Sequence, residues 1–421
     1  MPNQGGGAAA ARREPRRRLS VHKYGGTSVS TPARIVRIAR RIAAGRGDGD
    51  GLVVVVSAMG DTTDRLVKLA HRISREPVER EMDTLLSAGE TITAPLLAMA
   101  LQEAGVAAIS LSGAQAGIRT SRSHTRARIL DVVPTRVLEE LDAGRVVVVA
   151  GFQGVNEAFD VTTLGRGGSD TTAVALAAAL GAEVCEIYTD VSGIFSADPR
   201  VVPEARLLSS ISYEEMLDLA SVGAKVMHPR AVEIGELYNV PIRVRSSFDD
   251  GPGTIITRST EVEERNRVRG IAAEENVAKL TIVGVPDRPG IAAGIFTPLA
   301  ESNISVDVIL QNVSRGGVTD LSFTVPASDA TRAERILAKV QKVIGAESVV
   351  TDRDVAKVSI VGTGMLGQPG IAAKMFTCLA EAGINIEMIS TSEIRITCIV
   401  ARDSAKDAVR ALHRAYQLDQ A

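Results

Sequence analysis

The chain has no tryptophan, few other aromatic residues and only three cysteines among its 421 residues. Without clustered aromatic side chains, nothing offers a stacking platform for nucleic-acid bases. The formal net charge of −2 gives no electrostatic reason to expect a nucleic-acid partner. Cys185, Cys378 and Cys398 are odd in number, widely spaced and outside any Cys-x-x-Cys motif. We therefore expect neither a disulfide framework nor a zinc site, and a reducing cytoplasm fits best.

Long apolar runs are also lacking. No run has the length of a bilayer span, so we expect no membrane partner. Residues 1–18 join a glycine run and an alanine run to five arginines: Arg12, Arg13, Arg16, Arg17 and Arg18. Because no apolar segment of signal-peptide length follows, they are not a secretion signal. We interpret residues 1–18 as a disordered basic tail, with contact to a polyanion as the alternative.

The length predicts two or three domains. Runs rich in β-branched residues at 51–57, 145–150 and 183–189 alternate with helical patterns at 32–44 and 170–180. Such runs are typical of strands buried on both faces, in a mostly parallel sheet covered by helices. Polar motifs follow several of these strands, where open α/β sheets bind their ligands. The first part of the chain therefore predicts an α/β domain with a ligand site.

One polar motif, at 164–172, places an arginine, two glycines, a serine and an aspartate before an alanine-rich helix. Gly167 and Gly168 let the backbone approach a ligand, and the helix N-terminus favours negative charge. Arg166 can bind a carboxylate or phosphate in bidentate fashion, and Asp170 can orient a reacting group. The motif predicts a site for a small anion beside a nucleotide. The alternative is a plain loop in which Ser169 caps the helix.

A second motif, at 21–29, places Lys23 at the end of a predicted strand, ahead of Gly25, Gly26 and two hydroxyl residues. A lysine beside a flexible backbone suits the neutralisation of phosphate. The alternative is a solvated surface lysine.

The last third of the chain contains an internal repeat. Residues 289–293 recur as 369–373, both reading Pro-Gly-Ile-Ala-Ala, and Phe296-Thr297 recurs as Phe376-Thr377. Each copy reads as a strand, a Pro-Gly turn, an amphipathic helix and a strand. The charged stretch 261–269 lies just before the repeat and marks a domain junction.

The motifs around Lys23, Arg166, Asp198 and Lys225 resemble those of aspartate kinases, in that family's order, and the repeat resembles paired ACT domains. The likeness extends from about Leu19 to about Leu418. It implies an amino-acid-kinase-type α/β fold, a mostly parallel sheet covered by helices, followed by two βαββαβ ACT-like α+β units. The implied division is a tail at 1–18, a catalytic domain at 19–250, a linker at 251–267 and a regulatory pair at 268–421. In this family one ACT unit is inserted in the other, so the first would span about 279–345 and the second 268–278 plus 350–421.

The resemblance implies transfer of a phosphoryl group from ATP to the β-carboxylate of L-aspartate. The product would be 4-phospho-L-aspartate, at the first step of the pathway to lysine, threonine and methionine. Because the carboxylate is already a nucleophile, the enzyme must mainly overcome its repulsion by the triphosphate and align the two. Mg²⁺ would accompany ATP and bridge its phosphate oxygens, held mainly by the nucleotide and water, with no protein ligand assigned.

The resemblance also implies roles for individual residues. Lys23, Arg166 and Asp170 would be catalytic, and Glu90, interpreted as lying at a helix start, would pair with the α-ammonium of aspartate. The substrate-binding set would be Thr63, Glu90, Arg166, Gly167, Gly168 and Ser169. The ATP-binding set would be Lys23, Tyr24, Gly25, Gly26, Ser57, Thr189, Asp190, Phe195, Ser196, Ala197, Asp198, Pro199, Arg200 and Lys225. His228 is interpreted as a capping or packing residue before Pro229.

The ACT pair implies feedback inhibition by lysine, threonine or both, and self-association into a homo-oligomer. The effector residues would be Asp287, Pro289, Gly290, Ile291, Ala292, Ser305, Val306, Asp307, Gln311, Gln368, Gly370, Ile371, Asn385 and Ile386. Ser305 and Ile291 depart from residues frequent in relatives and leave the effector open. Three alternatives stand: repeats that only dimerise, a kinase of the same fold acting on glutamate, N-acetylglutamate or UMP, and an amino-acid sensor with an inactive kinase domain.

Overall fold

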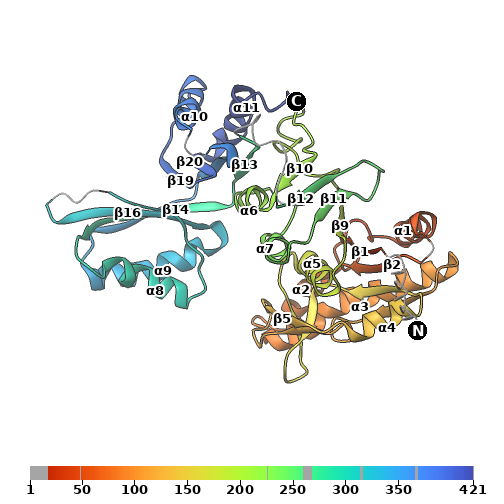
Figure 1. The fold of residues 1–421 in the computed structure, drawn as a ribbon. Helices are drawn as coiled ribbons and strands as arrows, with labels where there is room; N and C mark the ends of the chain where they lie inside the picture. Colours follow the sequence, from red (N-terminus) through yellow and green to blue (C-terminus); the bar gives the residue numbers. More distant parts are fainter. Residues whose placement is uncertain are drawn as a thin grey trace, which may run out of the picture. The chain divides into compact units, whose positions relative to one another are not determined.

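The computed structural model describes residues 18–47, 49–224, 226–258, 268–312, 316–365 and 368–420 (Figure 1). The basic tail up to residue 17, Lys225 and residues 259–267 of the predicted linker lie outside the described residues. The chain forms two compact units. One contains the chain up to Asp190 together with Ile234–Gly251, and the other contains Val191–Glu233 and the chain from Pro252 onward.

The first unit is built on a parallel sheet whose strands lie in the order β11, β9, β1, β2, β6, β3. The strands are β1 (Leu19–Tyr24), β2 (Gly51–Val56), β3 (Ala108–Leu111), β6 (Val146–Ala150), β9 (Val184–Thr189) and β11 (Ile242–Ser246). The valine runs of β2 and β6 are buried throughout. The predicted parallel sheet is therefore confirmed, because only strands covered on both faces can bury every side chain of such a run.

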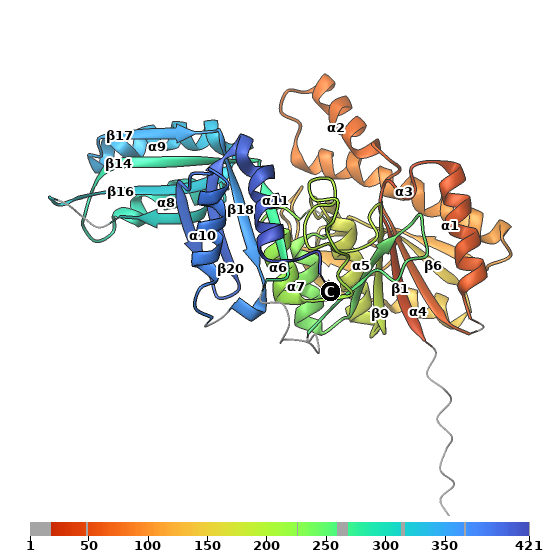
Figure 2. The same ribbon diagram turned by 90° about the horizontal axis from the view of Figure 1, so that it is seen from above.

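Helices cover both faces of this sheet (Figure 2). They are α1 (Pro32–Gly45), α3 (Glu79–Glu103), α4 (Thr135–Asp142) and α5 (Gly168–Leu180), whereas α2 (Thr62–Ile73) packs on α3. Helix α7 (Pro229–Tyr238) contains the boundary at which the chain passes from one unit to the other. One face forms an apolar core with α1 and α3, which includes Leu97 and Leu101. Helix α5 packs on the other face, against β1, β2 and β9. It ends as predicted at Gly181, whose φ of 62° is a left-handed C-cap conformation.

A small second sheet belongs to this unit, in the order β5-β4-β7-β8. Its strands are β4 (Ile118–Thr120), β5 (Ile129–Val132), β7 (Gln153–Val155) and β8 (Val161–Thr163). Strand β8 ends two residues before Gly165, so it delivers the arginine–glycine motif directly to the start of α5.

Helix α3 corrects one expectation. Among the described residues it is the one helix long and apolar enough to span a bilayer, and half of its most apolar window is buried in this unit. The prediction that no run is long enough to span a bilayer is therefore wrong, because α3 has the required length and composition. Ser87 and Glu90 interrupt the apolar run, which hid its length. Burial of Leu97 and Leu101 against the sheet accounts for its apolar character.

The second unit begins with a loop that leads to β10 (Ser210–Ser212), which pairs in parallel with β12 (Thr254–Thr257). Helix α6 (Tyr213–Ser221) starts with a capping box, in which the Ser212 side chain accepts from the Glu215 N–H and the Glu215 carboxylate accepts from the Ser212 N–H. The Glu215 carboxylate also accepts hydrogen bonds from the backbone and the hydroxyl of Thr363.

The two sequence repeats each fold as an antiparallel sheet with two helices, as predicted. The first repeat contains β14 (Val277–Pro286), α8 (Ile291–Glu301), β15 (Asp307–Gln311), β16 (Val318–Pro326), η1 (Ala327–Asp329), α9 (Ala330–Ile344) and β17 (Ser348–Asp352). The second contains β13 (Gly270–Glu274), β18 (Val355–Val361), η2 (Thr363–Met365), α10 (Ile371–Glu381), β19 (Met388–Thr391), β20 (Arg395–Ala401), η3 (Arg402–Ser404) and α11 (Ala405–Ala415). The sheet orders are β15-β16-β14-β17 and β13-β18-β20-β19. Helices α8 and α10 both start after a glycine in the left-handed region, Gly290 and Gly370, with φ values of 88° and 93°.

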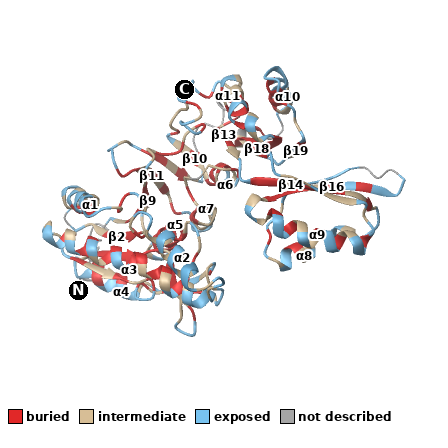
Figure 3. Cartoon of the chain, turned by 180° about the vertical axis from the view of Figure 1, so that it is seen from behind, coloured by how far each residue is buried: buried red, intermediate tan, exposed pale blue. Residues whose placement is uncertain are grey.

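Strand β13 precedes the whole first repeat in sequence yet pairs with β18 of the second. The first repeat is therefore an insertion within the second. Figure 3 shows the buried strands and the exposed outer surfaces of the helices in both repeats. The core of the second repeat also takes in Ala197 and Val202, from the loop that opens the second unit.

Candidate active site

The carboxyl end of β1 carries an ion pair. Lys23 lies on β1 and Asp170 in the first turn of α5, and the Lys23 Nζ is 2.6 Å from the Asp170 Oδ1. Both side chains are about nine-tenths buried. The burial removes the alternative of a solvated Lys23, because a lysine at the surface would keep its ammonium in water. Helix α5 also places Asp170 at its positive N-terminal end.

Gly26 allows the turn after β1 to lie against the turn after β2. A Cβ at Gly26 would meet the Ala58 carbonyl oxygen at 3.0 Å and the Gly60 carbonyl oxygen at 3.3 Å. The Gly60 N–H donates to the Gly26 carbonyl at 3.0 Å. The neighbouring Gly25 N–H already donates to the Tyr188 carbonyl at 3.2 Å. The Gly25 N–H is therefore already occupied within the fold in this structure.

Glu90 lies in the middle of α3, since that helix begins at Glu79. The interpretation of Glu90 as a helix-start residue is therefore wrong, because the helix continues upstream of the apolar run that the sequence displays. Its side chain is buried, and its Oε1 accepts the Ala58 N–H at 2.9 Å. No hydrogen-bond donor among the described residues reaches its Oε2. Burial raises the pKa of Glu90 to about 7, with hydrogen bonding to Ala58 opposing the shift.

The glycine that precedes Glu90 has a packing reason. A Cβ at Gly89 would lie 2.7 Å from the Ala58 Cβ, so only glycine lets α3 approach the turn after β2. Ser57 and Thr63 flank this turn and are partly buried, Ser57 directly after β2 and Thr63 in the first turn of α2. The structure thus gathers Lys23, Asp170, Glu90 and the Ser57–Thr63 turn at the carboxyl ends of neighbouring strands.

The arginine–glycine loop is shaped by left-handed residues. Gly165 has φ 79° and Gly167 has φ 68°, and Gly167 is the N-cap of α5. The alternative in which Ser169 caps the helix is therefore wrong. Ser169 is buried inside the first turn, where a Cβ added at Gly151 would lie 2.9 Å from its side chain, whereas Arg166 is exposed. Gly168 packs so tightly on Phe152 that a Cβ would lie 2.9 Å from its ring.

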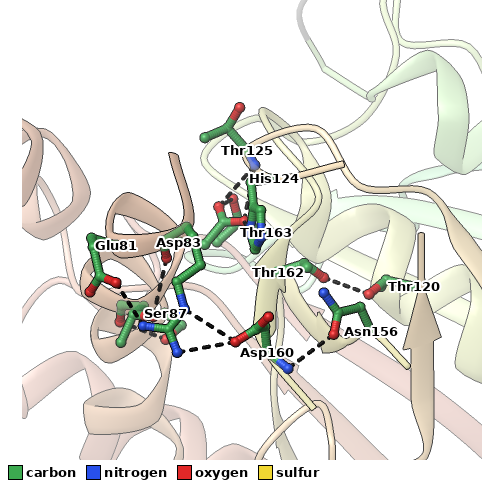
Figure 4. A network of polar contacts seen from close by, with 12 residues as sticks. Glu81, Asp83, Ser87, Thr120, His124, Thr125, Asn156, Asp160, Thr162 and Thr163 are labelled. Carbon is green, nitrogen blue, oxygen red and sulfur yellow. Dashed lines mark hydrogen bonds and ion pairs between the residues drawn. The ribbon is translucent and has the colours of Figure 1, made fainter. Parts of the chain in front are cut away.

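Two features of this region were missed from the sequence. Phe152 follows β6 with φ 68°, an unusual conformation for a non-glycine residue, and its N–H donates to the Thr172 hydroxyl at 3.1 Å. Asp83 on α3 is fully buried and accepts hydrogen bonds from His124, Thr125 and Thr163 (Figure 4). No sequence signal identifies either one, because a backbone angle and a long-range hydrogen bond leave no local pattern.

Family models assign the same segments. Residues 18–246 match the amino acid kinase family, and residues 279–345 and 358–416 each match an ACT domain. The chain is 52% identical to the aspartokinase of Corynebacterium glutamicum over 406 residues, which is 95% of this chain and 96% of that protein. The chain belongs to the aspartokinase family. Two structures of Escherichia coli aspartokinase III are similar at 27% and 28% identity, each covering 94% of this chain and 99% of the other, with TM-scores of 0.80 and 0.72. The first is a complex with aspartate and ADP in the R-state, and the second a complex with lysine and aspartate in the T-state.

The nucleotide residues expected of an aspartokinase fall in both units. Thr189 and Asp190 end β9 in the first unit, and the Thr189 carbonyl accepts from the backbone and the hydroxyl of Ser247. In the second unit, the segment from Phe195 to Arg200 runs along the second ACT domain. Its second residue, Ser196, is fully buried, and the Ser196 hydroxyl lies 2.9 Å from the His413 Nε2.

Arg200 of this segment is exposed and pairs with Asp198 at 2.7 Å. Its hydrogen bond lowers the pKa of the Asp198 carboxyl despite some burial. Lys225 lies outside the described residues, and His228 directly precedes α7.

The effector residues expected of an aspartokinase occupy corresponding turns of the two ACT domains. Asp287, Pro289 and Gly290 are exposed in the turn before α8, and Gln368 and Gly370 are exposed in the turn before α10. Ile291 and Ala292 open α8, Ile371 opens α10, Gln311 ends β15, and Asn385 and Ile386 precede β19.

A pocket of about 450 Å³ in the second unit is lined by residues of both ACT domains. Its lining includes Ser305, Val306, Asp307, Lys357 and Arg395. The Lys357 Nζ is 2.8 Å from the Asp307 Oδ2. Burial opposes ionisation of Asp307, but the hydrogen bond and charge of Lys357 outweigh it and lower its pKa. Ser305–Asp307 therefore face a polar pocket, separate from the exposed Pro-Gly turns.

Proposed function

We propose that this aspartokinase transfers the γ-phosphoryl group of ATP to the β-carboxylate of L-aspartate, forming 4-phospho-L-aspartate. The observation that carries the proposal is the buried Lys23–Asp170 pair at 2.6 Å, together with a buried Glu90 that bonds the turn after the neighbouring strand β2 and keeps one carboxylate oxygen unpaired. Family membership and the aspartate and ADP bound by E. coli aspartokinase III support the same substrates.

Lys23 supplies the positive charge for the transferred group. In this structure Asp170 neutralises it. A phosphate oxygen entering beside Lys23 competes with that carboxylate, and the ammonium then stabilises the charge that develops in the transition state. Asp170 stays within reach to keep the ammonium oriented. The nucleophile needs no proton removed, so neither residue has to act as a general base.

Glu90 and Arg166 recognise the two charged ends of aspartate. The unpaired Oε2 of Glu90 is an acceptor for the α-ammonium, and the exposed guanidinium of Arg166 is a bidentate donor for a carboxylate. Thr63 and the N–H groups of Gly167 and Ser169 supply further hydrogen bonds, whereas the Gly168 N–H already donates to the Gly165 carbonyl at 3.0 Å. Opposite charges on two separate elements select an amino acid with a second carboxylate.

Magnesium accompanies ATP in this proposal. The described residues hold no group of three or more His, Cys, Asp or Glu side chains that could bind a metal ion. Mg²⁺ commonly needs only one or two carboxylates when phosphates and water complete its coordination, and the carboxylate of Asp170 fits that requirement. Asp170 would hold the ion together with the nucleotide phosphates, and the ion would supply positive charge that offsets the repulsion between those phosphates and the incoming carboxylate.

The ACT domains make the enzyme a regulated one. We propose lysine, threonine or both as feedback inhibitors, supported by the lysine bound to E. coli aspartokinase III. An effector acts by shifting the population toward a conformation in which the Lys23 or Arg166 site is distorted. We further propose a cytoplasmic homo-oligomer that associates through its ACT domains.

Release of ADP from Mg-ATP in the presence of L-aspartate tests the function, with glutamate, N-acetylglutamate and UMP as competing acceptors. Turnover is expected with aspartate alone. Lys23→Ala should fold but lose turnover, whereas Lys68→Ala, an exposed lysine on α2, should keep it. Near-normal turnover of Lys23→Ala would overturn the assignment of Lys23. Suppression by lysine plus threonine is expected, and equal turnover with and without them would remove the feedback proposal.

A further inference from the structure

Asp83 is a buried carboxylate with no place in the chemistry described so far. It lies on α3 with its side chain wholly removed from solvent. Its partners come from two segments distant in sequence, at separations of 41 to 80 residues (Figure 4). Burying a charge is costly unless hydrogen bonds satisfy it, so this arrangement calls for a reason.

The hydrogen bonds of Asp83 converge on one loop and one strand end. The Thr163 hydroxyl donates to Oδ1 at 2.5 Å, and the Thr125 N–H donates to both carboxylate oxygens at 3.0 Å. His124 Nδ1 lies 2.8 Å from Oδ2. Because an ionised carboxylate only accepts, Nδ1 must carry the proton, which sets the tautomer of His124.

Thr125 takes a conformation that its own side chain disfavours. Its φ is 62°, in the left-handed region where a β-branched residue is rare. Such strain persists only where surrounding contacts hold it, and the hydrogen bonds from the Thr125 N–H to Asp83 are such contacts.

The loop that contains Thr125 lies directly against the arginine–glycine loop that contains Gly165. A Cβ at Gly165 would be 3.2 Å from the Thr125 carbonyl oxygen, so the two backbones are in close contact. The Ala127 N–H donates to the Thr163 carbonyl at 2.9 Å. The backbone one residue before Arg166 therefore rests on the segment that Asp83 holds.

The same helix carries Glu90. Asp83 and Glu90 are seven residues apart on α3, which is close to two helical turns, and both are buried. We propose that Asp83 is a positioning residue for aspartate binding. It holds Thr125 and Thr163, and through them the loop that carries Arg166, so that Arg166 keeps its place relative to Glu90. The inference rests on the proposed function, in which Glu90 and Arg166 bind opposite ends of the substrate. One rigid helix then sets the spacing of the two recognition charges.

The test compares Asp83→Asn with Arg80→Gln. Arg80 lies one turn earlier on α3, is half-exposed and bonds Asp160 at 3.0 Å, so it also ties the helix to the small sheet but not to the loop before Arg166. In Asp83→Asn an NH₂ group replaces one acceptor and faces groups that all donate. We expect the KM for aspartate to rise about tenfold or more, while the KM for Mg-ATP stays within about twofold. Arg80→Gln should leave both constants near wild type.

Two substitutions of His124 test the same hydrogen bond without changing Asp83, and they remain informative if Asp83→Asn folds poorly. His124→Asn keeps an N–H near the position of Nδ1 and should stay close to wild type. His124→Leu removes the donor and should raise the KM for aspartate selectively. Equal effects of the two variants, or a KM for aspartate that rises no more than in Arg80→Gln, would overturn the proposal. A parallel rise of both KM values with a lower Tm would also overturn it, since that marks general loosening.

Amide hydrogen exchange in residues 163–168 of the ligand-free enzyme tests the positioning role of Asp83 separately from the proposed kinase function. Faster exchange in Asp83→Asn than in Arg80→Gln would support the positioning role. Absence of turnover with aspartate in the wild-type enzyme would refute only the proposed function. Unchanged exchange in Asp83→Asn would refute the positioning role while leaving aspartate turnover by the wild type intact.

Discussion

The titration of Glu90 makes a quantitative prediction for substrate binding. Its pKa in the ligand-free enzyme is raised to about 7, mainly by burial. Only the ionised carboxylate can pair with the α-ammonium of aspartate, so binding draws on the deprotonated fraction alone. For a pKa of 7, the apparent Kd for aspartate should rise about tenfold between pH 8 and pH 6. The carboxyl groups of aspartate stay ionised over this range and contribute nothing to the change.

Calorimetric titration of aspartate in the absence of nucleotide is the suitable assay, because the phosphates of ATP titrate near the same pH. Repeating the titration in buffers of different ionisation enthalpy counts protons. At pH 6 about 0.9 proton should leave on binding, and at pH 8 only about 0.1. Glu90→Gln should bind aspartate more weakly and with no dependence on pH over this range. Glu140→Gln is the matched control, since Glu140 is also buried but lies on α4 and pairs with Arg145. A wild-type Kd that is constant from pH 6 to pH 8 would refute the reasoning.

The same shift has a signed consequence for stability. Because the folded state holds this proton more tightly than the unfolded state, Glu90 costs stability as pH rises from about 4.5 to about 7. The difference of about 2.5 pKa units corresponds to at most about 3 kcal/mol. Glu90→Gln should therefore raise the Tm of the ligand-free enzyme at pH 8 and leave it nearly unchanged at pH 4.5. An equal change at both pH values would mean that packing of the amide, and not charge, is responsible.

Three further predictions concern stability. Leu97→Ala should lower the free energy of unfolding by about 2–5 kcal/mol, because this fully buried side chain fills the core between α3 and the sheet; a loss below about 1 kcal/mol in urea denaturation would contradict this. Gly117→Ala should destabilise by clearly more than Gly144→Ala: both have φ near 80°, but a Cβ at Gly117 would lie 1.9 Å from the Val133 carbonyl oxygen and one at Gly144 meets nothing within 4 Å. Equal melting temperatures would rule out the clash. Burial lowers the pKa of His413, so its contribution to stability is present above about pH 6.5 and is lost as pH falls through the lowered value. Urea denaturation from pH 8 to pH 5 should show a steeper loss in wild type than in His413→Gln, and identical slopes would exclude this role.

The sequence predicted those features that depend on local pattern. The valine runs of β2 and β6 become buried parallel strands, and the repeated Pro-Gly turns become matching helix starts at Gly290 and Gly370. The Lys23 and Asp170 motifs, 147 positions apart by their numbers, meet in one ion pair. Parallel strands bring their carboxyl ends to one edge, which is why motifs after different strands could be expected to meet.

The errors arose where packing decides the outcome. Glu90 was interpreted as a helix-start residue because the apolar pattern begins near it. Helix α3 in fact begins eleven residues further upstream, at Glu79. The cap of α5 depends on the left-handed φ of Gly167, which a serine two positions later does not reveal. Asp83 carries no motif at all. Its importance emerges only when the hydrogen bonds to His124 and Thr163 are known.

The insertion of the first ACT domain into the second makes it an exchangeable module. Its first and last strands are neighbours, since β14 and β17 pair with Lys279 opposite Asp352. The chain therefore leaves and re-enters the second ACT domain at nearly one place, and a foreign domain with adjacent ends could be grafted there without cutting another strand. The second ACT domain has no such freedom, because Ala197 and Val202 are built into its core. Exchange of the first ACT domain therefore leaves the rest of the unit intact, whereas deletion of both ACT domains would remove support from the segment around Ser196.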